Sequence, residues 1–265
     1  MVERYRRGKG KRKLLGNHQK CWIWGRNLVT ETLRAGRWIP VDLLLSQDVT
    51  ADLRQPIVEL AESLGVPFEL VDANRIRQLC GTAEHQGFAA RMPEFPYTAA
   101  EELPEIVVLG KPAFLLMCDR IQDPYNFGAI LRSADCFGVD AVVIQETQQV
   151  GVTSQVARSS AGAVNTVPVV RHPSLPALAT ELGDLGVSLA ACSEKAVTDV
   201  AQADLTQAIA LIVGNEGTGV RPELQDAVSV SVRIPMHGSI GSLNAMVAAS
   251  VTLYEAQRQR HATAG

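Results

Sequence analysis

The chain has 265 residues, of which 46% are hydrophobic, 20% charged and 5% aromatic, a composition typical of a soluble protein with one large or two modest domains. Its five cysteines are scattered and never form a C-x-x-C pair, which argues against disulfides and zinc and fits a reducing cytosol. No apolar run approaches the length of a membrane span, and the N-terminus has no apolar signal core. We therefore expect a cytoplasmic protein that contacts no membrane.

The first 20 residues differ in charge from the rest of the chain. They contain eight Lys or Arg and one acid, whereas the remainder has 17 basic and 27 acidic residues, a net charge of −10. A basic arm on an acidic body predicts a disordered tail, residues 1–20, that meets phosphates. A solubilising leader without an RNA role is the alternative.

Residues 22–92 alternate between strand and helix patterns. Helical spacing over 52–64 places Ile57, Leu60 and Leu64 on one face, and Gly65 ends that helix. Strands are expected at 22–25, 41–46, 66–71 and 87–92, and helices at 28–35, 52–64 and 74–80. This alternation predicts a small α/β domain at 21–92.

A second α/β domain is expected over residues 105–265. Residues 93–104, rich in proline and acid, favour an extended linker before it. Apolar runs typical of parallel strands covered on both faces occur at 113–118, 141–144, 167–170, 188–191, 209–213 and 228–234. Helices are expected at 128–137, 155–160, 175–182, 222–227 and 243–258.

Three polar or glycine-rich segments interrupt this second block. The first, 119–132, reads DRIQDPYNFGAILR. A strand ends, a turn follows, and Asn126 is a candidate helix N-cap, which would place Arg132 on the second turn. The alternative is that Asn126 only caps the helix and that Arg132 only solvates its surface.

The second segment, 211–219, reads LIVGNEGTG. A buried strand that runs into three glycines indicates close backbone approach. The spacing is neither the dinucleotide fingerprint nor a P-loop, which disfavours a Rossmann-type oxidoreductase. We expect a loop that wraps a small ligand with its backbone and in which Glu216 can pair with a cation. An ordinary strand-to-helix turn is the alternative.

The third segment, 234–249, reads IPMHGSIGSLNAMVAA. Ser242 is a candidate N-cap for the apolar helix that follows, and Asn244 offers an amide beside it. His237 stands alone, without the partners of a hydrolytic triad. Since no Cys or His cluster has metal-ligand spacing, we expect no metal.

Together, these segments resemble the three ordered motifs of the SpoU (TrmH) family, within the SPOUT superfamily of RNA methyltransferases. Residues 156–163 are also similar to the family's segment between its first two motifs. Residues 22–92, ending in His85-Gln-Gly-Phe-Ala-Ala-Arg91, are similar to the small substrate-binding domain, of ribosomal-protein L30e type, in members that act on large-subunit ribosomal RNA. The resemblance covers residues 22–260, so the basic arm lies outside it.

The resemblance implies a fold, a cofactor and an assembly. The fold would be α/β, with a trefoil knot in the C-terminal methyltransferase domain and an L30e-like N-terminal domain. The cofactor would be S-adenosylmethionine, lined by Gly214, Ile234 and Leu243, with Met236 and Ser242 nearby. Members of the family are homodimers, and the helix expected from 243 is a reasonable interface element, although an internal core role fits its pattern equally well.

The implied activity is methylation of a ribose 2′-hydroxyl in structured RNA. The resemblance is closest to the 23S rRNA guanosine-2′-O-methyltransferases, so the methylated nucleoside would be a guanosine. Its catalytic residues would be Asn126, Arg132, Glu216 and Asn244. Because arginine stays protonated in proteins, we expect Arg132 to clamp a phosphate or the nascent alkoxide rather than to act as a base. The alternatives are a transfer-RNA 2′-O-methyltransferase of the same family and a non-catalytic RNA-binding protein with this fold.

The sequence departs from the family pattern at two places. Many relatives continue the third motif with Val-Ser, where this chain has Ala245 and Met246. This change removes a helix hydroxyl behind the cofactor site. Phe127 stands where smaller aliphatic residues are common, and it is expected to reshape the mouth of the site near Asn126.

Overall fold

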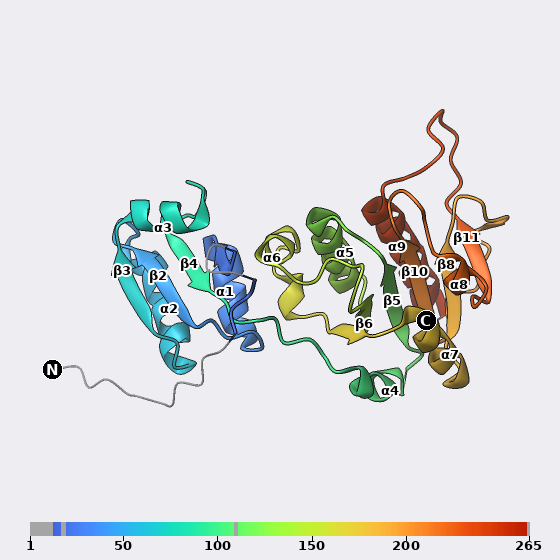
Figure 1. The fold of residues 1–265 in the computed structure, drawn as a ribbon, viewed down its shortest axis with the longest axis horizontal. Helices are drawn as coiled ribbons and strands as arrows, with labels where there is room; N and C mark the ends of the chain where they lie inside the picture. Colours follow the sequence, from blue (N-terminus) through green and yellow to red (C-terminus); the bar gives the residue numbers. More distant parts are fainter. Residues whose placement is uncertain (1–12, 17–19, 109–110, 264–265) are drawn as a thin grey trace. The chain divides into compact units, whose positions relative to one another are not determined.

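The computed structural model describes residues 13–16, 20–108 and 111–263. The chain divides into two compact units, residues 1–96 and 97–265 (Figure 1). Most of the basic arm predicted at 1–20 lies outside the described residues. Within the described residues, no helix is both long and apolar enough to cross a membrane.

Over its described residues, the N-terminal unit consists of a four-stranded sheet and three helices. The strand order is β1-β4-β2-β3, with β2 and β3 parallel and the other pairs antiparallel. The elements are β1 (Trp22–Trp24), α1 (Arg26–Ala35), β2 (Asp42–Ser46), α2 (Ala51–Ser63), β3 (Phe68–Val71), α3 (Ala73–Cys80) and β4 (Phe88–Arg91). All seven elements expected at 22–92 are present, and their ends coincide with the expected ones or differ by one or two residues.

Local capping explains where α3 lies. The Asp72 side chain accepts a hydrogen bond from the Asn74 backbone N–H at 2.7 Å, which satisfies one of the free donors of the first turn. Gly81 ends the helix in the left-handed conformation, with φ +68°, which glycine adopts without a steric cost. Asp72 and Gly81 therefore define the two ends of α3, which packs against β1, β2 and β4.

The expected linker at 93–104 is structured over much of its length. Thr98 pairs with Val170 of the C-terminal unit, and a 3₁₀ turn, η1 (Ala100–Glu102), leads into α4 (Leu103–Val107). Proline favours the first turn of a helix, where its missing N–H is not needed, and Pro104 occupies such a position. Leu103 and Val107 are buried, so an apolar i, i+4 pair outweighs the proline-rich composition.

The C-terminal unit is built on a seven-stranded sheet of order β7-β6-β5-β10-β8-β11-β9. Every neighbouring pair is parallel, as the apolar runs predicted. The strands are β5 (Phe114–Asp119), β6 (Ala141–Gln145), β7 (Val169–His172), β8 (Ser188–Cys192), β9 (Thr198–Asp199), β10 (Ile209–Gly214) and β11 (Val230–Arg233). The sequence did not predict the two-residue strand β9.

Helices cover both faces of this sheet (Figure 1). On one face α9 packs against α5, β8 and β10, and α5 packs against α6. On the other face, Leu115 and Met117 of β5 share a core with Leu178 of α7 and Leu224 of α8, and α4 adds to it. The remaining elements are α5 (Pro124–Cys136), α6 (Ser154–Ser159), η2 (Ala163–Asn165), α7 (Leu175–Asp184), α8 (Pro222–Gln225) and α9 (Ala245–Thr263).

The strand order reverses beside β5. The chain moves outward from β5 through β6 to β7, then crosses to β8, and later inserts β10 between β5 and β8. The carboxyl ends of β5 and β10 consequently lie side by side, with Asp119 paired to Gly214. Ligands of open α/β sheets bind outside the carboxyl ends of strands at such a switch point, which locates the site.

Candidate active site

Three loops leave the sheet at the same edge. They follow β5, β10 and β11, and they contain the three polar or glycine-rich segments that the sequence singled out. Because these strands run parallel through β8, their carboxyl ends share one edge of the sheet. The segments 119–132, 211–219 and 234–249 therefore meet, although about a hundred residues separate the first from the others.

A hydrogen-bonded chain of three side chains joins the segments. Asn126 of α5 donates from Nδ2 to Oε1 of Glu216 at 2.9 Å. Asn244, at the start of α9, donates from Nδ2 to Oδ1 of Asn126 at 3.2 Å. Asn126 is half-buried, whereas the other two residues are exposed. Three of the four expected catalytic residues thus lie together.

The first turn of α9 fixes the direction of these hydrogen bonds. The backbone N–H of Met246 donates to Oδ1 of Asn244 at 2.8 Å, so the amide oxygen of Asn244 points into its own helix and its NH₂ group points outward. Asn126 must then present its oxygen to Asn244, which leaves its NH₂ group for the Glu216 carboxylate. A backbone donor therefore determines the orientation of both amides.

The helix caps differ from those predicted. Asp123, not Asn126, caps α5: its side chain accepts from the Tyr125 backbone N–H at 2.7 Å, because the helix begins at Pro124. An earlier start places Arg132 on the third turn rather than the second. Asn244, not Ser242, caps α9, since the loop continues to Asn244. Ser242 remains exposed in that loop.

Arg132 lies on α5 outside the three-residue chain. Its side chain is exposed, and among the described residues it has no hydrogen bond or ion pair. A guanidinium presents five N–H donors and a permanent positive charge. Arg132 is therefore able to meet an anionic group from solution.

The glycine-rich loop folds back on the strand that precedes it. Asn215 and Gly219 exchange two backbone hydrogen bonds, of 3.1 and 2.8 Å, which close a tight hairpin. A Cβ at Gly214 would lie 2.1 Å from the carbonyl carbon of Gly219 and 2.2 Å from the nitrogen of Val220. The close approach predicted at Gly214 is thus met by the loop's own backbone.

The Asn215 side chain holds this hairpin together. Its Oδ1 accepts from the backbone N–H groups of Gly217 at 3.0 Å and Thr218 at 3.1 Å. Its Nδ2 donates to the carbonyl of Arg120 at 2.9 Å, in the loop after β5. Asn215 thereby fixes Glu216, its neighbour in sequence, and it was not among the residues expected at the site.

A buried ion pair beneath the loops was also missed. Asp119 is fully buried at the end of β5. It accepts from the backbone N–H of Arg221 at 2.8 Å and from its Nε at 2.7 Å. Arg120, whose φ is +59°, donates to the carbonyl of Gly219 at 3.2 Å. The sequence did contain one signal for this ion pair: Asp119 is a charged residue at the end of an otherwise apolar strand.

The loop between β11 and α9 carries most of the expected cofactor residues. Ile234 is half-buried, and Ser242 is exposed. Met236 is 37% and Leu243 39% exposed, so both offer apolar surface to a ligand at this edge. These loop residues and Gly214, at the end of β10, lie at the carboxyl edge of the sheet.

Both units match known family models. Residues 113–254 match the SpoU rRNA Methylase family, and residues 22–98 match the RNA 2′-O ribose methyltransferase substrate binding family. The two matches and the fold define an RNA methyltransferase with a separate substrate-binding domain. The chain belongs to the SpoU rRNA methylase family, as its three motifs indicated.

Relatives and solved structures agree with this assignment. The chain is 35% identical over 248 residues to the 23S rRNA (guanosine-2′-O-)-methyltransferase RlmB of Coxiella burnetii, covering 91% of this chain and 97% of that one. It is 34% identical over 245 residues to RlmB of Nitrosomonas europaea, covering 92% and 94%. The SpoU methyltransferase AviRb from Streptomyces viridochromogenes, solved in complex with the cofactor AdoMet, superposes with a TM-score of 0.77 at 25% identity, covering 94% and 96%.

Proposed function

We propose that this protein transfers a methyl group from S-adenosylmethionine to the ribose 2′-hydroxyl of a guanosine in 23S rRNA, in the cytoplasm. The observation that carries the proposal is the chain of hydrogen bonds from Glu216 through Asn126 to Asn244 at the switch point of the sheet. It unites one residue from each of the three motif segments. The names of the Coxiella and Nitrosomonas relatives support the reaction and the RNA.

The residues at the sheet edge fit S-adenosylmethionine, the cofactor present in the AviRb structure. Met236 and Leu243 offer exposed apolar surface to an adenine ring and a methionine chain. The exposed 235–244 loop offers backbone groups to polar edges. We assign cofactor contacts to Gly214, Ile234, Met236, Ser242 and Leu243. When bound, the cofactor supplies an electrophilic methyl group on a sulfonium leaving group.

The chain's own residues position the acceptor. Asn126, Glu216 and Asn244 form a preorganised polar cluster against which a ribose can be oriented, and orientation alone is worth about 7–11 kcal/mol in favourable cases. The Arg132 guanidinium carries five N–H donors, and it holds an RNA phosphate or stabilises negative charge as it develops on the 2′-oxygen. The hydroxyl proton then passes to phosphate or water.

Methyl transfer to a 23S rRNA transcript, followed by mapping of the 2′-O-methyl position, tests the proposal. Wild-type protein with S-adenosylmethionine should label one guanosine ribose. Arg132→Ala should lower turnover far more than RNA affinity, because one contact among many is lost from binding, and Arg132→Lys should recover part of the rate by restoring the charge. Equal losses of turnover and affinity would contradict the role of Arg132. Methylation of transfer RNA alone would contradict the substrate.

We also propose that two copies of the chain pair through α9. Val247, Val251 and Tyr254 are 36%, 36% and 57% exposed, and their i, i+4, i+7 spacing places them on one face of the helix. Ile240, in the preceding loop, is 75% exposed. Such a contiguous apolar stripe marks an interaction surface. Because members of the resembled family are homodimers, we assign this surface to a second copy of the chain.

The trefoil knot implied by the resemblance remains a proposal. Two features support it. Strand β10 follows β5 and β8 in the sequence but lies between them in the sheet. The end of α9 is then held at the opposite edge, where Arg260 donates to the carbonyls of Pro112 at 2.9 Å and Leu205 at 3.1 Å. A crystal structure whose C-terminal segment passes through no loop would contradict the knot.

A further inference from the structure

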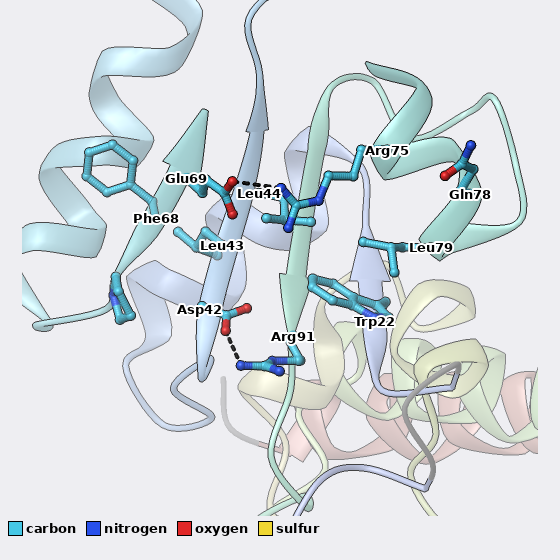
Figure 2. A pocket seen from close by; sticks show the side chains of 11 residues that line it. Trp22, Asp42, Leu43, Leu44, Phe68, Glu69, Arg75, Gln78, Leu79 and Arg91 are labelled. Atoms are coloured by element: carbon cyan, nitrogen blue, oxygen red, sulfur yellow. Dashed lines mark hydrogen bonds and ion pairs between the residues drawn. The ribbon is translucent and has the colours of Figure 1, made fainter. Parts of the chain in front are cut away.

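A pocket of about 590 Å³ lies in the N-terminal unit, between α3 and the sheet. Figure 2 shows its walls: Arg75 and Leu79 of α3 on one side, and Trp22, Asp42 and Arg91 of the strands on the other. Its volume falls within the range of small-ligand sites. The pocket belongs to the unit that matches a substrate-binding family, yet none of its residues has entered the reaction described above.

Strand register explains why these residues gather. Arg91 of β4 pairs with Trp22 of β1 on one side and with Asp42 of β2 on the other, and Leu44 pairs with Glu69 of β3. Directly paired residues project from the same face of a sheet. The pattern therefore lays an aromatic ring, an aliphatic side chain and charged groups along one face, which α3 covers incompletely.

The charges on this face form two ion pairs. Arg91 pairs with Asp42, and Arg75 pairs with Glu69 at 2.7 Å. Each pair is accessible, with the Arg91 and Asp42 side chains about one third exposed and the Arg75 and Glu69 side chains about half exposed. Because the charges cancel, the pocket does not favour a phosphate. It favours a neutral ligand that carries both donors and acceptors.

The apolar walls restrict the ligand further. Trp22, Leu44 and Leu79 line the pocket. Trp22 and Leu44 are only 7% and 5% exposed, so the apolar surface they offer is narrow, and a flat ring is the shape that packs against it. Burial raises the pKa of Asp42, an effect that Arg91 opposes. The Asp42 side chain is 27% exposed, so its carboxylate can accept a further hydrogen bond from a ligand beside Arg91.

We propose that this pocket binds a guanine base of an unpaired segment of the RNA substrate. Guanine presents an acceptor, O6, next to two donors, N1–H and the N2 amino group. An arginine beside a carboxylate offers the complementary pattern, since arginine recognises guanine O6 and carboxylates accept from base donors. Unpaired bases are bound by stacking and edge contacts of this kind. The inference rests on the proposed function only in taking RNA as the substrate.

Tryptophan fluorescence provides a direct test on the full-length protein. All three tryptophans, Trp22, Trp24 and Trp38, belong to the N-terminal unit, and Trp22 lines the pocket. Guanosine monophosphate should quench the emission saturably, adenosine monophosphate more weakly, and inorganic phosphate not at all. Arg75→Gln and Glu69→Gln should each lower the affinity for guanosine monophosphate by about fivefold or more, which is the lower end of the effect of one good base contact.

Arg77→Gln is the matched control, because Arg77 lies on the same helix and is exposed but does not line the pocket. Unfolding curves of the three variants should superpose on that of the wild type, since all three side chains are solvent-accessible. With RNA as substrate, Arg75→Gln should raise KM and leave kcat unchanged. Absence of saturable quenching, equal quenching by phosphate, or equal effects of Arg75→Gln and Arg77→Gln would overturn the proposal.

The test separates this inference from the proposed function. The nucleotide titration involves no methyl donor, so it reports only on the pocket. Methyl transfer by the wild type without guanosine monophosphate binding would reject the pocket alone. Guanosine monophosphate binding without methyl transfer to any RNA would reject the proposed reaction and leave the base site standing.

Discussion

Asn244 donates from its side-chain amide to Oδ1 of Asn126 at 3.2 Å, across 118 residues of chain. The same side chain accepts the Met246 backbone N–H at 2.8 Å and so caps α9. An amide can present its oxygen to only one side, so the cap determines which group reaches Asn126. A local requirement of a helix end thus sets the polarity of a hydrogen-bonded chain that ends on Glu216.

The ion pair between Asp119 and Arg221 should dominate the stability of the site. Asp119 is fully buried and the Arg221 side chain is 14% exposed. Removing one partner leaves an uncompensated buried charge, which costs about 3–5 kcal/mol. Asp119→Ala should lower the free energy of unfolding in urea by that amount. Asp199→Ala removes the partner of Arg233, which is 45% exposed, and should cost at most about 1 kcal/mol. Similar losses for the two variants would contradict the assignment.

Gly214 and Gly217 should respond differently to the same substitution. A Cβ at Gly214 would lie 2.1 Å from backbone, whereas a Cβ at Gly217 would have its nearest contact at 3.5 Å, with Asn215 Oδ1. Gly214→Ala should therefore displace the 215–219 hairpin and weaken S-adenosylmethionine binding about tenfold or more, the effect of about 1.4 kcal/mol. Gly217→Ala should bind the cofactor like the wild type. Calorimetric titration measures both, and undiminished affinity of Gly214→Ala would refute the tight hairpin.

Two thiols whose pKa values are raised should make the protein less stable in alkaline solution. Burial raises the pKa of Cys192 from 9.0 to about 11, and burial also raises the pKa of Cys118. Between pH 9 and 11 the unfolded thiol loses its proton while the folded thiol keeps it, so the unfolded state binds fewer protons and stability falls as pH rises. Cys192→Ala should reduce this slope relative to the wild type. Parallel pH profiles of the unfolding free energy would contradict the prediction.

The exposed face of α9 should control the oligomeric state. Val251→Glu places a charge within the apolar stripe, and desolvating an unpaired charge at an interface is costly. Sedimentation should show a shift from dimer to monomer. Val197 is 87% exposed and lies outside the stripe, so Val197→Glu should leave the dimer intact. If both Val251→Glu and Val197→Glu dissociated the dimer, or if neither did, the assignment of α9 as the interface would be wrong.

Much of the fold was predictable because its strands are buried on both faces. β5 and β10 appear in the sequence as unbroken apolar runs, and their predicted ends differ from the observed ones by a single residue. Short elements escape this signal. β9 has two residues and α4 has five, too few to establish a periodicity. They form because the surrounding tertiary structure provides a partner strand and a buried surface.

The convergence of the three segments was predictable, whereas the local geometry at their helix ends was not. The motif resemblance brought Asn126, Glu216 and Asn244 together, but local rules misassigned both helix caps. Asp123 and Asn126 are both good N-cap residues, and the position of Pro124 at the first helical residue decides between them. The pairing of Asp119 with Arg221 spans 102 residues, so no local pattern contains it.

The central claim is that the Asn244–Asn126–Glu216 chain orients the acceptor for methyl transfer. Asn244→Asp tests it most directly, because aspartate caps helices as well as asparagine does but has no donor for Asn126. Under single-turnover conditions at saturating RNA and S-adenosylmethionine, its rate should fall about tenfold or more, the loss of one hydrogen bond to a charged network, with the free energy of unfolding unchanged. Asn244→Ala should lose rate and about 1 kcal/mol of stability. A wild-type rate for Asn244→Asp would contradict the account.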